Sequence, residues 1–273
     1  MGMKVKTLFV LVLCAVVFAS VSVSAATEIT CSSTTSIENS GLFRHILPLF
    51  EKKTGIKVKV VARGTGAAIE MGKRGDADVA FVHAKDQELK AVEEGFFVSR
   101  QDVIYNYFVI IGPADDPAKI KGIKSAADAF KKISGSAPFV SRGDNSGTHT
   151  KELSIWEKAG IKPSGWKWYL EVGQGMEKTQ RIANEKRAYT LTDTGTWLAT
   201  KDKNKLEMVI VLEGDPALFN QYGIMAVNPQ RHRHIKYKEA MEFINWLISK
   251  EGQQAIASFK DKHGNQLFMP NAK

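Results

Sequence analysis

Residues 28–50, EITCSSTTSIENSGLFRHILPLF, carry the pattern that decides the fold class. Glu28–Cys31 is predicted to be a short strand, and the apolar residues from Phe43 to Phe50 follow the i, i+3, i+4, i+7 spacing of one helix face. Hydroxyl side chains from Ser33 to Ser36 lie between these two segments. A strand that passes through a polar loop into an amphipathic helix is the repeating unit of α/β proteins.

The same alternation continues along the chain and predicts an α/β fold. The first helix is expected to kink at Pro48 and to end at Gly55, and two more helices are predicted at 146–160 and 240–248. Buried strands are predicted at 58–62, 78–83, 107–111, 207–212 and 223–227.

Two abrupt strand ends indicate where the chain passes between lobes. Gly112-Pro113 ends one predicted strand, and Glu213-Gly214-Asp215-Pro216 follows another. We therefore expect a discontinuous first lobe built from residues 27–112 and 213–273, and a second lobe built from residues 113–212.

Residues 1–26 have the features of a secretory signal peptide. Lys4 and Lys6 precede an apolar run, and small residues near Ala25 and Ala26 suit cleavage there. An uncleaved membrane anchor is the alternative, because the run is nearly long enough to span a bilayer. Bulky Leu13 before Cys14 argues against a lipoprotein cleavage site. We therefore expect an exported periplasmic protein.

The chain has a formal charge of +9, and loss of the two signal-peptide lysines leaves about +7. A basic protein can bind nucleic acid, an anionic surface or a small anion. Export argues against nucleic acid as a partner. Cys31 is the single cysteine outside the predicted signal peptide, so no internal disulfide is expected.

Three segments rich in Ser, Thr or Gly lie where a predicted strand meets a helix: Ser33–Ser36, Gly64–Gly66 and Ser141–His149. Helix N-termini expose N–H groups that attract anions, and hydroxyls add donors without adding charge. Plain helix capping is the alternative for the first segment, and a simple turn is the alternative for the second.

The third segment, SRGDNSGTH, is the most specific of the three. Arg142 can grip an oxyanion through two N–H groups, and Ser146-Gly147-Thr148 begins a helix. Asp144 could orient Arg142 or cap that helix. A structural cap beside a surface arginine is the alternative.

The order of these segments resembles the periplasmic tungstate-binding proteins of Tup-type ABC transporters. The resemblance covers essentially the whole chain after residue 26 and implies a type II periplasmic binding protein fold, with two α/β lobes, a hinge and a ligand cleft. Further matching segments are 75–79, 82–84, 105–106, 109–113, 173–176, 183–185, 189–193 and 213–215.

The resemblance also implies the roles of the site residues. One lobe would supply donors from its two loops, and the other lobe would close over the anion. The implied binding residues are Thr34, Thr35, Ser36 and Thr65 from the first lobe, and Arg142, Ser146, Gly147 and Thr148 from the second.

Two positions depart from the family pattern. The family usually has Thr where Ser33 stands, and it commonly has Arg where Thr194 stands. The second departure puts affinity and selectivity in question if that arginine touches ligand in relatives.

The absence of an acidic residue after the 78–83 strand bears on the identity of the anion. Related phosphate-binding proteins place an acidic acceptor near the ligand, because phosphate can carry a proton. Here the segment after the 78–83 strand reads His83-Ala84-Lys85. This favours a fully deprotonated dianion such as tungstate, molybdate or sulfate, and the choice among these three depends on the size of the cavity. The resemblance implies tungstate, with molybdate as a second ligand, and another tetrahedral oxyanion such as sulfate or phosphate is the alternative. The family implies a monomer that delivers its ligand to an ABC permease and its ATPase, without a cofactor.

Other classes of function remain open at this stage. A secreted hydrolase could use Ser146 and His149, although neighbours on one helical turn rarely form a nucleophile–base pair. His232 and His234 form a weak metal-binding pattern, and surface histidines are the simpler interpretation. The tryptophans at 156, 166 and 168 could form a sugar platform, but packing is the simpler interpretation. We expect neither enzymatic activity nor a bound metal.

Overall fold

The computed structural model describes residues 27–273, so the predicted signal peptide lies outside the described residues. Strands and helices alternate, which confirms the α/β class. The strands are β1 (Glu28–Thr34), β2 (Lys57–Arg63), β3 (Val79–Val82), β4 (Phe97–Gly112), β5 (Phe139–Ser141), β6 (Tyr169–Glu171), β7 (Thr190–Asp193), β8 (Val209–Leu212), β9 (Phe219–Val227) and β10 (Met269–Pro270). The helices are α1 (Thr35–Ser40), α2 (Leu42–Thr54), α3 (Thr65–Lys73), α4 (Lys85–Glu93), α5 (Ala126–Ser134), α6 (Gly147–Lys158), α7 (Met176–Glu185), α8 (Thr194–Thr200), the short 3-10 helix η1 (Pro216–Leu218), α9 (Tyr237–Ile248) and α10 (Lys250–Ala257).

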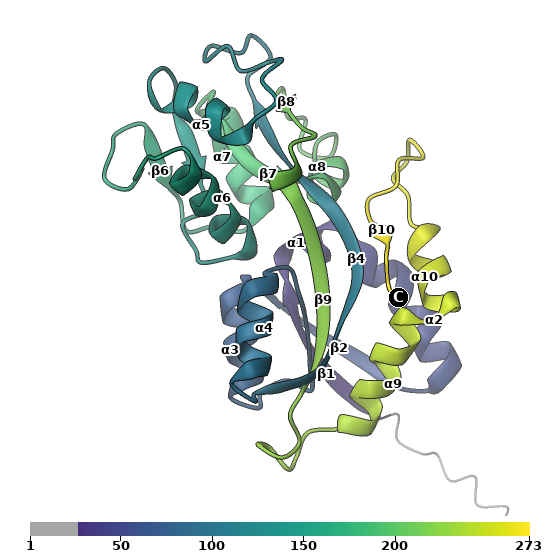
Figure 1. Cartoon of the computed structure of the whole chain (residues 1–273). Helices are drawn as coiled ribbons and strands as arrows, with labels where there is room; N and C mark the ends of the chain where they lie inside the picture. The colour runs from purple at the N-terminus through teal and green to yellow at the C-terminus, as the bar shows by residue number, and fades with distance from the viewer. Residues whose placement is uncertain (1–26) are drawn as a thin grey trace, which may run out of the picture.

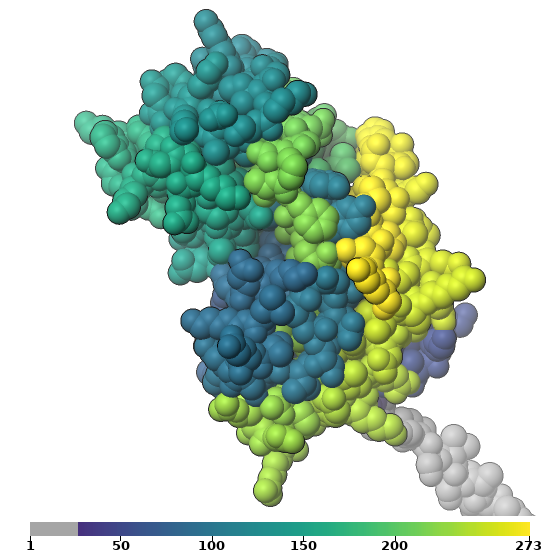
Figure 2. Space-filling view, viewed as in Figure 1, coloured from purple at the N-terminus to yellow at the C-terminus, as the bar shows by residue number. Residues whose placement is uncertain are grey.

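The elements form two lobes (Figure 1). Lobe 1 contains a sheet in the order β10-β4-β9-β3-β1-β2, together with α1–α4, α9 and α10. In lobe 2 the far end of β4 pairs with β7 and β8, and the short strands β5 and β6 pair beside the helices α5–α8. The space-filling view shows the two masses meeting at a waist (Figure 2).

Strands β4 and β9 connect the lobes, and both appear as long curved arrows in Figure 1. Pairing between β4 and β9 extends from Phe97 to Tyr107, whereas Phe108–Ile111 pairs with β7. The change of partner therefore falls at Tyr107–Phe108. The division at 112/113 and 212/213 stays a prediction, and it lies at the ends of β4 and β8, a few residues beyond this change.

Each lobe has three layers, because successive residues on a strand point to opposite faces. In β3, Val79 and Phe81 join the core cluster that contains Phe50 and Phe243, whereas Ala80 and Val82 join the cluster under α3 and α4. In β4, Phe108 and Ile110 alternate in the same way with Val109 and Ile111. Helices thus cover both faces, which explains why these strands are continuous apolar runs.

Several boundaries differ from the sequence prediction. Strand β4 begins at Phe97, ten residues before the predicted start, because its first part mixes polar and apolar residues and is only partly buried. Helix α2 runs on through Pro48, so a kink there stays a prediction, but Gly55 ends the helix as expected with φ +73° and a hydrogen bond to the Glu51 carbonyl. Between residues 27 and 273, no helix is both long and apolar enough to cross a bilayer.

Candidate anion-binding site

The starts of helices α3 and α6 face each other across the seam between the lobes. A Cβ atom placed on Gly64 would lie 3.5 Å from Cβ of Ser146, and one placed on Gly147 would lie 2.8 Å from Oγ1 of Thr65. The lobes therefore touch where two of the predicted loops meet. Their first backbone N–H groups have no acceptor inside the helix and point toward the seam.

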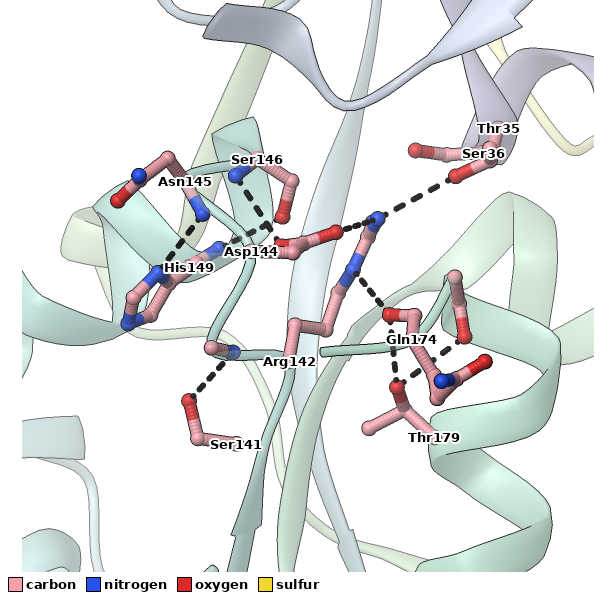
Figure 3. Close-up of polar contacts among 12 residues, drawn as sticks. Thr35, Ser36, Ser141, Arg142, Asp144, Asn145, Ser146, His149, Gln174 and Thr179 are labelled. Carbon is pink, nitrogen blue, oxygen red and sulfur yellow. Dashed lines mark hydrogen bonds and ion pairs between the residues drawn. The ribbon is translucent and has the colours of Figure 1, made fainter. Parts of the chain in front are cut away.

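Arg142 lies at the centre of this seam, with only 2% of its surface exposed (Figure 3). It follows β5, and its Nε donates to the Gln174 carbonyl at 3.3 Å. Its Nη2 donates to Thr35 Oγ1 at 3.4 Å and forms an ion pair with Asp144 at 2.5 Å. Arg142 thus links lobe 2 to the first loop of lobe 1.

Asp144 performs the first of the two roles that the sequence suggested, because it holds Arg142, but the cap of α6 is Ser146 and not Asp144. One carboxylate oxygen holds Arg142, and the other accepts the Ser146 N–H at 3.1 Å. Ser146 in turn caps α6, because its Oγ accepts the His149 N–H at 3.2 Å. The loop is therefore held rigid around the guanidinium.

Several donors remain free within the described part of the chain. The contacts of Arg142 use Nε and Nη2, which leaves both N–H groups of Nη1 without a protein partner. The hydroxyls of Thr65 and Thr148 are buried and have no hydrogen-bond partner among residues 27–273. Buried polar groups are rarely left unpaired, so the two hydroxyls point to a ligand, and Nη1 of Arg142 adds a charged donor at the same seam.

The first loop lies beside these donors. Thr34 caps α1 by accepting the Ile37 N–H at 3.5 Å, which is the capping role considered as the alternative. Thr35 contacts Arg142, and the Ser36 hydroxyl lies 3.2 Å from Nε2 of His83. The structure thus brings together at the seam residues from all three predicted loops.

A buried polar chain behind the site was not predicted. It joins His83 to the side chains of Asn220, Asn106 and Asp193, and Asp193 caps α8. Most of these residues lie within segments that matched the family pattern, but nothing in the sequence indicated that they contact one another. Gln174, whose carbonyl holds Arg142, was missed for the same reason.

Thr194, which replaces the common arginine, lies at the first position of α8. Its Oγ1 accepts the Tyr107 N–H at 3.5 Å, so the hydroxyl is turned toward the connecting strand β4.

The other sequence-level hypotheses find no support in the geometry. Nδ1 of His149 accepts the Asn145 N–H, and the Ser146 hydroxyl accepts a backbone N–H, so no side-chain hydrogen bond joins this serine to this histidine. His232 and His234 each bond to a backbone carbonyl. No group of three or more metal-ligand side chains occurs within 27–273. Trp156 is buried in the lobe 2 core and Trp168 packs against it, as the packing interpretation predicted, but that interpretation is wrong for Trp166, whose surface is 61% exposed.

Comparison with known proteins agrees with this geometry. A family model described as a PBP superfamily domain matches residues 20–251. The tungstate-binding protein TupA of Peptoclostridium acidaminophilum is 45% identical over 90% of this chain and 86% of its own length. The crystal structure of the tungstate ABC transporter from Geobacter sulfurreducens is 50% identical, with a TM-score of 0.77, over 85% of this chain and 98% of that chain.

A third relative is the tungstate-binding protein TupA of Desulfovibrio alaskensis G20, at 42% identity and a TM-score of 0.77 over 91% of this chain and all of that chain. These relatives are solute-binding proteins of transporters and not enzymes. The chain belongs to the periplasmic binding protein superfamily and, within it, to the family of the tungstate-binding TupA proteins.

Proposed function

We propose that this protein is the substrate-binding component of an ABC importer and that it holds one tungstate dianion between its lobes. The observation that carries the proposal is the free Nη1 group of buried Arg142, which lies at the seam with the unpartnered hydroxyls of Thr65 and Thr148. Each of these groups can donate a hydrogen bond, and the guanidinium cannot accept one. A fully deprotonated tetrahedral anion offers four acceptor oxygens to match them.

Donors from both lobes would replace the hydration shell of the anion. Thr34, Thr35, Ser36 and Thr65 would act from lobe 1, and Arg142, Ser146, Gly147 and Thr148 would act from lobe 2. The anion would bind to one lobe first, and rotation at β4 and β9 would then close the other lobe over it. The division into residues 27–112 with 213–273 and residues 113–212 defines the two moving bodies.

The names of the relatives support tungstate as the ligand. Two curated relatives, from Peptoclostridium acidaminophilum and Campylobacter jejuni, are named tungstate-binding protein TupA, at 45% and 41% identity. Molybdate has the same charge and shape, so we propose it as a second ligand. Sulfate is also a fully deprotonated dianion, so only the names of the relatives favour tungstate over it. Phosphate is least favoured, because it can carry a proton and the Asp144 carboxylate already holds Arg142 and the Ser146 N–H.

The proposal includes a cellular setting. The signal peptide would direct the chain to the periplasm and be cleaved near Ala25 or Ala26. The closed monomer would then deliver tungstate to a membrane permease driven by its ATPase, without a cofactor.

Isothermal titration of anion-free protein with tungstate, molybdate, sulfate and phosphate tests the proposal. Tight binding of tungstate with weak or absent binding of sulfate and phosphate is expected. Binding of none of the four anions would show that the loops serve only as helix caps. Preferential binding of phosphate would contradict the inference that this donor-lined site selects a fully deprotonated anion.

A further inference from the structure

A continuous chain of buried polar side chains crosses the connection between the lobes. It begins at Asp193, which caps α8 in lobe 2, and passes to Asn106 on β4 at 3.0 Å. Asn106 and Asn220 are partners in the register of β4 and β9, and their side chains are 2.7 Å apart. Asn220 then contacts His83 at 3.0 Å. The chain ends in lobe 1, at the anion site.

The direction of every hydrogen bond in this chain follows from the Asp193 end. Asp193 accepts the Thr196 N–H at 2.9 Å, and its carboxylate has only oxygens, so Asn106 must present its NH₂ group to it. The oxygen of Asn106 therefore faces Asn220, which must donate with its own NH₂ group. That leaves the oxygen of Asn220 for His83.

This direction fixes the tautomer of His83. Its Nδ1 must carry a hydrogen, because it faces the oxygen of Asn220 at 3.0 Å. In a neutral imidazole the other nitrogen, Nε2, is then a bare acceptor. It lies 3.2 Å from the Ser36 hydroxyl, which must donate to it. The Ser36 hydroxyl proton therefore points to His83 and away from any anion.

A dianion at the site would change the acceptor to which the Ser36 hydroxyl donates its hydrogen bond. Oxygens of the anion are strong acceptors and would draw the Ser36 proton toward themselves. Nε2 of His83 would then face an oxygen lone pair with no hydrogen between them, at a buried position where an unmade hydrogen bond is costly. A proton on Nε2 restores the contact, because the imidazolium donates to Ser36 Oγ.

The charges around His83 also favour a neutral ring without ligand and a protonated ring with a dianion bound. Burial lowers the pKa of His83 to about 4, the carboxylate of Asp193 opposes this, and the cations Arg142 and Lys151 add to it. Tyr222, stacked on the ring at 4.7 Å between centroids, is neutral because burial raises its pKa. The ring is therefore uncharged at neutral pH without a ligand. A dianion near Arg142 would offset both cations and favour the protonated ring.

We propose that His83 is a positioning residue of the anion site that takes up one proton from solvent when a dianion binds and thereby turns the Ser36 hydroxyl toward the ligand. The inference rests on the proposed function. Proton uptake on binding means that affinity rises as pH falls, because the bound state has the higher pKa. The limiting dependence is about tenfold in Kd per pH unit.

Isothermal titration of the anion-free full chain with sodium tungstate, in buffers of different ionisation enthalpy, counts the protons. At about pH 6.5 we expect uptake of up to one proton per tungstate, and less at about pH 8. His83→Asn keeps a donor toward Asn220 but does not titrate, so tungstate should still bind with no uptake. His45→Gln, on α2 far from the site, should leave the proton count unchanged.

Each other outcome decides the question. Tight tungstate binding by the wild-type protein with no proton uptake overturns the proposal and leaves the proposed function standing, whereas absence of tungstate binding rejects the function itself. If proton uptake is lost in His149→Asn but kept in His83→Asn, the proton binds to His149, and the proposal is overturned.

A spectroscopic measurement covers the case in which His83→Asn does not fold. Long-range ¹H–¹⁵N spectra of the ¹⁵N-histidine-labelled wild-type protein should show the Nδ1–H tautomer for the buried ring at position 83 without tungstate, and both nitrogens protonated with it. An unchanged neutral ring in the saturated complex contradicts the proposal.

Discussion

Replacing Arg142 with alanine removes a buried cationic side chain from the seam between the lobes. Two N–H groups of Nη1 have no partner among the described residues, so the wild-type side chain can give an anion two charge-assisted hydrogen bonds. Truncating one partner of a buried, hydrogen-bonded charge pair costs about 2–5 kcal/mol. We therefore expect tungstate affinity to fall by about thirtyfold to several thousandfold.

Titration calorimetry measures this loss, and thermal unfolding of the anion-free variants controls for folding. Arg142→Lys keeps the charge but loses the fork, so it should bind with intermediate affinity. Arg187→Ala is a matched control, because Arg187 is an exposed arginine that forms an ion pair with Asp115 at 2.8 Å. Unchanged affinity in a folded Arg142→Ala protein would refute the assignment of this loop to the anion.

Three further predictions test the seam and the lobe 2 core. Gly147→Ala should fold normally but bind tungstate weakly, because the added Cβ would lie 2.8 Å from Thr65 Oγ1 and keep the lobes apart. Small-angle scattering should show an open protein in the presence of tungstate. A compact variant that binds tightly would contradict this prediction. Thr65→Val should weaken tungstate binding by about tenfold, because one lost hydrogen bond costs about 1.4 kcal/mol. The melting temperature of the anion-free protein should stay the same or rise, since the removed hydroxyl has no partner within residues 27–273. A large loss of stability with unchanged binding would instead show that the hydroxyl has a structural role. Burial of Glu152 raises its pKa from 4.5 to about 8, so between these pH values the folded state holds a proton that the unfolded state has lost. The free energy of unfolding should therefore fall by up to about 1.4 kcal/mol per pH unit as pH rises toward 8. Urea unfolding of Glu152→Gln should show a flatter pH profile over this range, and a profile identical to that of the wild-type protein would contradict the prediction.

The sequence predicted the fold class and the three loops because both depend on local patterns. Strand β3 and the end of β4 are covered by helices on both faces, so they are continuous apolar runs that are easily recognised. The cap at Ser146 and the stop at Gly55 follow from the conformations that these residues prefer.

The parts that were missed depend on contacts between distant segments. The first half of β4 contains the polar run Ser99–Asp102 between apolar residues, and it is a strand because β9 pairs with it from more than a hundred residues away. Asn106, Asn220 and Asp193 are ordinary polar residues in sequence. They become a connected chain only when β4 lies beside β9 and β7.

The charge distribution at the seam suggests how such a site releases its ligand. Arg142 is the central cation, and the Asp144 carboxylate already neutralises much of its charge. The Arg142–Asp144 pair has little net charge, so a dianion would be stabilised mainly by directed donors: Nη1 of Arg142, the N–H groups at the starts of α3 and α6, and the hydroxyls of Thr65 and Thr148. These donors have short reach and belong to different lobes. Separation of the lobes by a few ångströms would remove the donors of one lobe, so we expect opening of the protein alone to weaken binding, without a competing ion.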